Sequence, residues 1–156
     1  MSLIIRQRIF ALTDTYDVCD HTGRPRYSVQ TEFFTIGHRI HIYEADSGAE
    51  VGRINERIFT LLQKAELLVR GVPCLITRQF TLFKPYYTLD NGWEIDGDFF
   101  GLDYKIIDGR GSVVATISKE LFHFSDTYTL TVTNPGDELA ALMTAITIDM
   151  MNCRNN

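Results

Sequence analysis

The stretch that most constrains the fold of this chain is its C-terminal segment, residues 137–151 (DELAALMTAITIDMM). Ala, Leu and Met are good helix formers, and their arrangement here leaves no polar stripe. Residues 134–136 (Asn-Pro-Gly) interrupt what precedes, Asp137 can cap the helix, and Glu138 places negative charge at its positive end. Because a helix that is apolar on every side must be buried on every side, the segment predicts a central core helix.

The length of this segment favours the core of a globular domain over a membrane span. About 15 residues of helix rise only about 22 Å, whereas a bilayer span needs about 20 residues. Membrane insertion is the alternative interpretation. Asp149, near the end of the segment, faces either an exit from the core or a buried hydrogen-bond donor.

The rest of the chain is a repeat. Similar Phe-centred motifs recur every 20 to 25 residues, at Phe10, Phe34, Phe59, Phe80, Phe100 and Phe122. About a dozen residues after each Phe comes a turn sequence, at residues 20–23, 46–48, 70–73, 90–92, 108–111 and 134–136. Asp and Asn tolerate a left-handed backbone and Gly adopts it freely, so these sequences predict hairpin turns. Regular spacing of this kind indicates repeated supersecondary units.

The segments between the turns predict strands, because they are rich in β-branched and aromatic residues that partly alternate with polar ones. They include residues 27–29, 40–43, 104–107, 113–117 and 128–133. Six units of two strands give twelve antiparallel strands, or eleven if the helix displaces the last return strand. Residues 59–69 also fit a short helix, but the repeat favours a strand there. With no linker in the series, residues 1–156 are expected to form a single domain.

The number of strands also fits the helix. Twelve strands about 4.8 Å apart and tilted by about 40° close into a barrel with a radius of about 12 Å. A helix packed against a sheet needs about 10 Å between its axis and the strands, which a barrel of eight strands would not provide. We therefore predict an all-β fold: a closed antiparallel barrel of about twelve strands, in six hairpin repeats, around the hydrophobic C-terminal helix.

Composition and motifs exclude several function classes. The formal net charge of −5 argues against a nucleic-acid-binding surface. The three cysteines are far apart and suit a reducing compartment, and no signal peptide opens the chain, so we expect a cytoplasmic protein. No G-x-S-x-G elbow, P-loop, H-E-x-x-H or C-x-x-C motif is present. We therefore expect no enzymatic activity and no cofactor.

The remaining metal candidates are weak. His38 and His41, three residues apart, fall on opposite faces of a strand and cannot share a metal. The acidic residues between Glu94 and Asp103 are too closely spaced for an EF-hand loop, so solvated turn carboxylates are expected and calcium is the alternative.

Charged residues mark one position of the repeat. Two residues before each Phe stand Arg8, Glu32, Arg57, Arg78, Asp98 and Glu120. On a strand these side chains would share a face with the Phe and could form a neutralised ring at one end of the barrel. The functional alternative is a phosphate site formed by Arg57, Arg78 and Lys84, because arginine forks and a nearby lysine suit phosphate. Exposed tyrosines at 86 and 87 would then suit a membrane interface.

Several segments, taken in order and spacing, resemble a known family. They are residues 7–12 (QRIFAL), 20–23 (DHTG), 80–84 (FTLFK), 94–99 (EIDGDF), 117–122 (ISKELF), 126–128 (DTY) and the terminal apolar helix with Asp149. Together they resemble the LURP-one-related family, whose fold is shared with the tubby C-terminal domain and the phospholipid scramblases. The resemblance covers essentially the whole chain and implies a twelve-strand barrel around a hydrophobic helix. Tubby domains bind phosphoinositides and scramblases act at membranes, whereas bacterial LURP-one-like proteins have no settled activity.

Two functions are therefore expected from the sequence. The first is a non-catalytic, tubby-like module that binds anionic phospholipid or another ligand at a barrel rim, peripherally at the membrane. The second is a structural or protein-interaction scaffold without lipid activity, which the acidic net charge favours. Both exclude a nucleic-acid partner and a transmembrane span.

Overall fold

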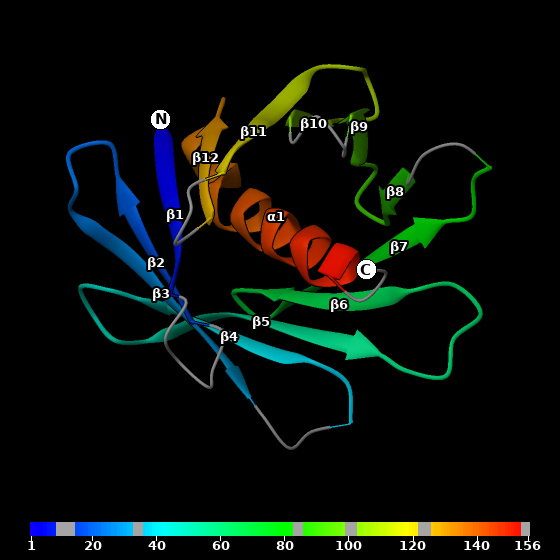
Figure 1. Ribbon diagram of the computed structural model, residues 1–156, viewed down its shortest axis with the longest axis horizontal. Helices are drawn as coiled ribbons and strands as arrows, with labels where there is room; N and C mark the ends of the chain where they lie inside the picture. Colours follow the sequence, from blue (N-terminus) through cyan, green and yellow to red (C-terminus); the bar gives the residue numbers. More distant parts are fainter. Residues whose placement is uncertain (9–14, 33–35, 83–85, 99–102, 122–125, 154–156) are drawn as a thin grey trace.

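The computed structural model describes residues 1–8, 15–32, 36–82, 86–98, 103–121 and 126–153 (Figure 1). These form twelve β-strands, one short 3-10 helix and one α-helix. The strands are β1 (Ser2–Arg8), β2 (Thr15–Asp20), β3 (Pro25–Glu32), β4 (Arg39–Glu44), β5 (Glu50–Arg57), β6 (Lys64–Val69), β7 (Val72–Gln79), β8 (Tyr86–Leu89), β9 (Glu94–Asp98), β10 (Asp103–Ile107), β11 (Val113–Leu121) and β12 (Asp126–Val132). The helices are η1 (Pro135–Asp137) and α1 (Glu138–Cys153).

The strands form a closed antiparallel barrel, as the sequence predicts. Each strand pairs with its neighbours in the chain, and β1 pairs with β12 to close the ring, for example through Ser2 opposite Thr131. Closure satisfies the backbone groups that an edge strand would leave open. The prediction of twelve strands is confirmed. In the sixth unit α1 takes the place of the return strand, and β1, which precedes the first Phe motif, supplies the twelfth strand.

Five of the six predicted turns connect hairpins. In the first, the carboxylate Oδ1 of Asp20 accepts hydrogen bonds from the backbone nitrogens of Thr22 and Arg24. Gly23 has a φ of +86°, which suits a residue without a Cβ atom. Asp108 binds the backbone of its own turn in the same way. The sixth sequence, residues 134–136, leads into η1 and α1 instead of a hairpin.

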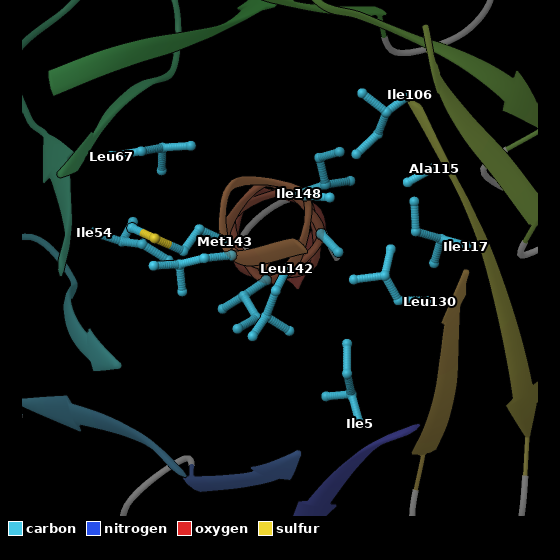
Figure 2. Packing of buried hydrophobic residues seen from close by; sticks show 14 of the residues in the cluster. Ile5, Ile54, Leu67, Ile106, Ala115, Ile117, Leu130, Leu142, Met143 and Ile148 are labelled. Atoms are coloured by element: carbon cyan, nitrogen blue, oxygen red, sulfur yellow. The ribbon is translucent and has the colours of Figure 1, made fainter. Parts of the chain in front are cut away.

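Helix α1 runs through the interior of the barrel (Figures 1 and 2), which confirms the predicted core helix. Between Glu138 and Met151 only Ala140 and Asp149 are not classed as buried. Leu142, Met143 and Ile148 point outward from the helix into side chains of the barrel wall (Figure 2). Burial of apolar surface on all sides of one helix explains why its sequence has no polar stripe.

The first turn of α1 is tied to the barrel wall by a buried carboxylate. Glu138 is only 2% exposed, and its Oε1 accepts hydrogen bonds from the hydroxyl of Tyr27 at 2.8 Å and from Arg26 at 2.9 Å. Negative charge in the first turn also opposes the positive end of the helix dipole. These contacts hold the helix N-terminus at the end of the barrel where β3 begins.

One strand prediction is wrong in extent. Residues 59–69 were expected to form a strand throughout, but β6 begins only at Lys64, and residues 58–63 form a loop. Phe59 has a φ of +60°, a left-handed conformation that ends the ladder of β5. The Phe motif of this unit therefore lies between strands and not within one.

Candidate functional site

The sequence candidates lie at one end of the barrel, here called the loop end. It is the end where β3, β5 and β7 finish and where β4, β6 and β8 begin. The opposite end carries the short hairpin turns and is called the turn end. Arg57 and Arg78 are the last or nearly the last residues of β5 and β7, and both therefore lie at the loop end. Lys84, the third candidate, lies outside the described residues.

Arg57 lies on the outer face of the barrel wall. It is opposite Lys64 in the register of β5 and β6, and its Nη2 lies 2.8 Å from Oε2 of Glu66, which alternates with the buried Ala65 and Leu67. Lys64 shares the outer face with Arg57. Lys64 was not among the sequence candidates, although its position opposite Arg57 could have been found from the hairpin register.

Arg78 lies on the inner face of the wall, because it is two and four residues after the buried Ile76 and Cys74 and therefore shares their side of the strand. Its guanidinium carbon is 5.9 Å from the ring centre of Tyr87, and its Nη1 donates to Oε1 of Gln63 at 3.1 Å. The structure therefore brings Arg57 and Arg78 to the same end of the barrel but places them on opposite faces of its wall.

The predicted ring of charges is not formed among the described members of that set. Glu32 contacts His41 and Arg39, which belong to the neighbouring strand β4. Arg57 contacts Glu66 on β6 in the same manner. Glu32 and Arg57 are thus compensated by the neighbouring strand and not around the rim, whereas Arg78 contacts the neutral side chains of Gln63 and Tyr87. The side chains of Arg8, Asp98 and Glu120 lie outside the described part of the structure.

The expectation of two exposed tyrosines beside the site is wrong for Tyr87. This residue is fully buried, and its hydroxyl donates to Oδ1 of Asn152 at 2.5 Å near the end of α1. Tyr86, its neighbour on β8, is half-buried. The strand alternation of β8 explains the difference, because only Tyr87 points inward.

The most unusual feature of the loop end is a set of exposed apolar side chains. Five of them, on three successive loops, are between 83% and 102% exposed and are here called the apolar rim: Ile36, Phe59, Leu61, Phe80 and Leu82. Sequence reasoning assigned these Phe motifs to the repeat that builds the barrel and so missed their exposure. The signal was present, because each motif sits midway between two predicted turns. Phe10, Phe34, Phe100 and Phe122 lie outside the described residues.

Neighbouring loops of the apolar rim are braced against each other. Gly37 has a φ of +86°, and a Cβ atom there would lie 3.0 Å from Ile58 of the next loop. His38 donates its backbone N–H to Glu56 at 2.8 Å, and the backbone nitrogen of Arg78 donates to the carbonyl oxygen of Gln63 at 2.9 Å. The three loops therefore form one supported edge.

Below this edge, the end of α1 is fixed by tyrosines. The carboxylate of Asp149 accepts hydrogen bonds from the hydroxyls of Tyr16, at 2.9 Å, and Tyr128. Of the two alternatives for Asp149, the structure shows the buried donors. Together with the Tyr87 contact to Asn152, these bonds anchor the last turns of α1 at the loop end.

Buried tyrosines make the stability of the barrel sensitive to alkaline pH. Desolvation raises the pKa of Tyr27 and Tyr87 to about 12 and that of Tyr104 well above 10. In the unfolded chain these hydroxyls ionise near pH 10, so between pH 10 and 12 the folded state binds more protons. We expect the free energy of unfolding, measured by urea titration, to be unaffected by these groups below pH 10 and to fall as pH rises above it. Tyr87→Phe is expected to flatten this dependence, and an equally steep fall in that variant would contradict the assignment.

The other sequence candidates have structural partners. His38 contacts Glu56, and the two ring nitrogens of His41 contact Glu32 and Glu50. Cys74 is buried, and desolvation raises the pKa of its thiol to about 11, which disfavours the reactive thiolate. Among the residues that the structure describes, no three His, Cys, Asp or Glu side chains converge as a metal site would need.

Comparison with known proteins identifies the family. The family model described as LURP-one-related matches residues 1–150. The chain belongs to the LURP-one-related family. It is 27% identical over 153 residues to the uncharacterised protein YxjI of Bacillus subtilis (strain 168), an alignment covering 97% of this chain and 93% of that protein.

A solved structure has a similar fold. The X-ray structure of a protein from Arabidopsis thaliana superposes with a TM-score of 0.64 over 97% of this chain and 91% of that one, at 13% sequence identity. This similarity shows a shared fold. In the described part of the chain, no helix combines the length and apolarity needed to cross a bilayer.

Proposed function

We propose that this LURP-one-related protein is a non-catalytic module that binds anionic phospholipid through the loop end of its barrel and acts peripherally at the cytoplasmic face of a membrane. The observation that carries the proposal is the coincidence of basic side chains and exposed apolar side chains at one end. Lys64 and Arg57 are adjacent on the outer wall, and Arg78 is on the next strand but one from Arg57. Phe59 and Leu61 lie on the loop that connects Arg57 to Lys64.

The electrostatic part of this binding has a limited size. Each Lys or Arg near an anionic surface contributes about 1 kcal/mol, and the effect is screened by salt. Glu66 offsets part of the charge of Arg57. The site therefore suits weak, salt-sensitive attraction to a charged surface, with Lys84 as a further contributor predicted from the sequence.

Co-sedimentation with vesicles tests the proposal. The triple variant Arg57→Ala/Lys64→Ala/Arg78→Ala is expected to bind phosphatidylserine or phosphoinositide vesicles about 100-fold more weakly than the parent at low salt. Neutral phosphatidylcholine vesicles should show a smaller difference, because the charge attraction is absent there. The measurement is the bound fraction as a function of lipid concentration, at low and physiological ionic strength.

A matched control removes the same charge from the opposite end. Arg24, Arg70 and Arg110 are exposed residues of the turn end, and their triple alanine variant should bind as the parent does. Equal losses in both variants would mean that net charge alone matters and would overturn the site. If the parent binds no vesicle at low salt, the protein-interaction scaffold becomes the favoured function.

A further inference from the structure

The apolar rim has a geometry that charge attraction alone does not explain. Five large apolar side chains are almost fully exposed at the loop end, although the barrel buries nearly all comparable side chains elsewhere. At the turn end the exposed apolar residues among those described are Met1, Val72 and Val113, which are 48%, 67% and 40% exposed and so less exposed than the five of the apolar rim. Large exposed apolar groups gathered in one place indicate an interaction surface.

The loop that carries Phe59 is built to present it. Phe59 adopts a φ of +60°, which is unfavourable for a residue with a Cβ atom, and its side chain is thereby directed away from the barrel. Backbone strain of this kind persists where the surrounding structure supports it and is concentrated at functional positions. Here the support comes from Ile58, packed near Gly37, and from the hydrogen bond between Gln63 and Arg78.

The same loop reduces the cost of entering an apolar medium. The hydroxyl of Thr60 donates to the carbonyl oxygen of Leu62 at 2.6 Å, so two polar atoms at the tip satisfy each other. Unpaired backbone groups are what makes an irregular loop costly in lipid. Phe59 and Leu61 flank this internally bonded threonine and point outward.

From these observations we infer that the apolar rim inserts into the bilayer, with Phe59, Leu61, Phe80 and Leu82 reaching the hydrocarbon boundary while Arg57, Lys64 and Arg78 stay at headgroup level. The inference rests on the proposed function and adds the depth and orientation of binding. The barrel stands end-on, with the C-terminal end of α1 toward the membrane and the turn end away from it. In this orientation the apolar side chains meet the hydrocarbon region and the basic side chains meet the anionic headgroups, so each kind of side chain faces the layer of the bilayer that suits it.

The charge distribution favours a bilayer over a second copy of the chain. In a two-fold symmetric dimer the same patch faces itself, so Arg57, Lys64 and Arg78, whose charge Glu66 offsets only in part, would approach their own symmetry mates. A membrane of anionic lipids instead offers opposite charge around an apolar interior. The apolar side chains also project from three separate loops and not from a flat face, which suits insertion between lipid chains.

The first test removes apolar surface from the rim without changing charge. Leu61→Ser/Phe80→Ser is expected to lower the partition coefficient for phosphatidylserine-containing vesicles by about 30-fold or more at physiological salt, because two apolar side chains no longer leave water. The matched control Val72→Ser/Val113→Ser changes exposed residues of the turn end and should bind as the parent does. All four positions are exposed, so circular dichroism and thermal unfolding should show intact folds.

The second test reports depth directly. The chain has a single tryptophan, Trp93, at the turn end, so Trp93→Phe provides a background without tryptophan fluorescence. In that background Leu61→Trp should shift its emission to the blue on vesicle binding and be quenched by brominated lipid chains, whereas Val72→Trp should show neither change. The native Trp93 in the parent should likewise remain unquenched.

The outcomes separate the two proposals. If Leu61→Ser/Phe80→Ser binds as tightly as the parent and Leu61→Trp is not quenched, insertion is overturned while charge-based binding stands. Absence of any vesicle binding by the parent overturns both. If sedimentation shows that the parent self-associates and that the rim variant is monomeric, the apolar rim is an interface between copies of the chain and insertion is again overturned.

Discussion

Replacing Asp149 with alanine is expected to lower the free energy of unfolding by about 3 kcal/mol, because two tyrosine hydroxyls lose their acceptor inside the barrel. Tyr16 and Tyr128 are each only 7% exposed, and both donate to the Asp149 carboxylate. An unsatisfied buried hydroxyl costs about 1–3 kcal/mol. Urea unfolding followed by circular dichroism measures the difference.

Conservative variants identify the source of this cost. Tyr16→Phe and Tyr128→Phe should each destabilise the barrel by about 1–2 kcal/mol, because each leaves one bond to the carboxylate in place. Adding both Phe substitutions to Asp149→Leu should restore much of the stability lost in Asp149→Leu alone, since no polar group then remains unpaired. A triple variant as unstable as the sum of the single changes would contradict this account.

Much of the fold could be predicted, because the local pattern of each element agrees with the place that the element takes in the whole barrel. The apolar segment ending near Met151 has no polar stripe, and only the interior of a barrel buries a helix on every side. The turns at 20–23 (DHTG) and 108–111 (DGRG) fix hairpins through hydrogen bonds to the side chain of their first residue, Asp, which the sequence makes recognisable. Consistency between patterns of this kind is what makes a sequence specify one structure.

The loop end was harder to predict, because side chains alternate between the inner and outer faces only within a strand, and this rule gives no direction for residues in the loops. Phe59 was expected to continue the strand, and with it Arg57 to point into a shared ring. The left-handed conformation of Phe59 ends that alternation and turns the side chain to solvent. Arg57 and Arg78 both stand two residues before a Phe, yet they occupy opposite faces of the wall. Arg57 comes three residues after the inward-facing Ile54, whereas Arg78 comes two residues after the inward-facing Ile76.

The loop end and the anchored helix are connected features. The hydroxyl of Tyr87 contacts Asn152 of α1, and its ring contacts Arg78 near the end of β7. The helix end thus supports the wall from which the loops of the apolar rim project. A module that inserts loops into a membrane needs such a rigid base, because ordering a flexible loop on binding would cost conformational entropy. The position of α1 inside the barrel therefore has a direct consequence for the proposed surface.

The position of α1 can be tested at a place where it lies close against the wall. Gly52 on β5 faces Met143, and a Cβ atom at Gly52 would lie 2.6 Å from the Met143 sulfur and 3.4 Å from Cβ of Ile42. Met143 and Ile42 are fully buried, as Figure 2 shows for Met143 beside Ile54. Gly52→Val is therefore expected to lower the free energy of unfolding by about 3 kcal/mol, and Gly52→Ala by less, through overpacking.

The sign of this effect is diagnostic, because valine is favoured over glycine in a strand that has room for it. Without the helix against β5, Gly52→Val would stabilise the barrel. Met143→Ala alone should cost about 2–5 kcal/mol by leaving a cavity, and in the double variant the valine should fill part of that space. The double variant is thus expected to be more stable than the sum of the single effects predicts, with urea unfolding as the measurement. If the two effects are additive, the side chains at positions 52 and 143 do not compete for the same space, and the close contact between α1 and β5 is contradicted.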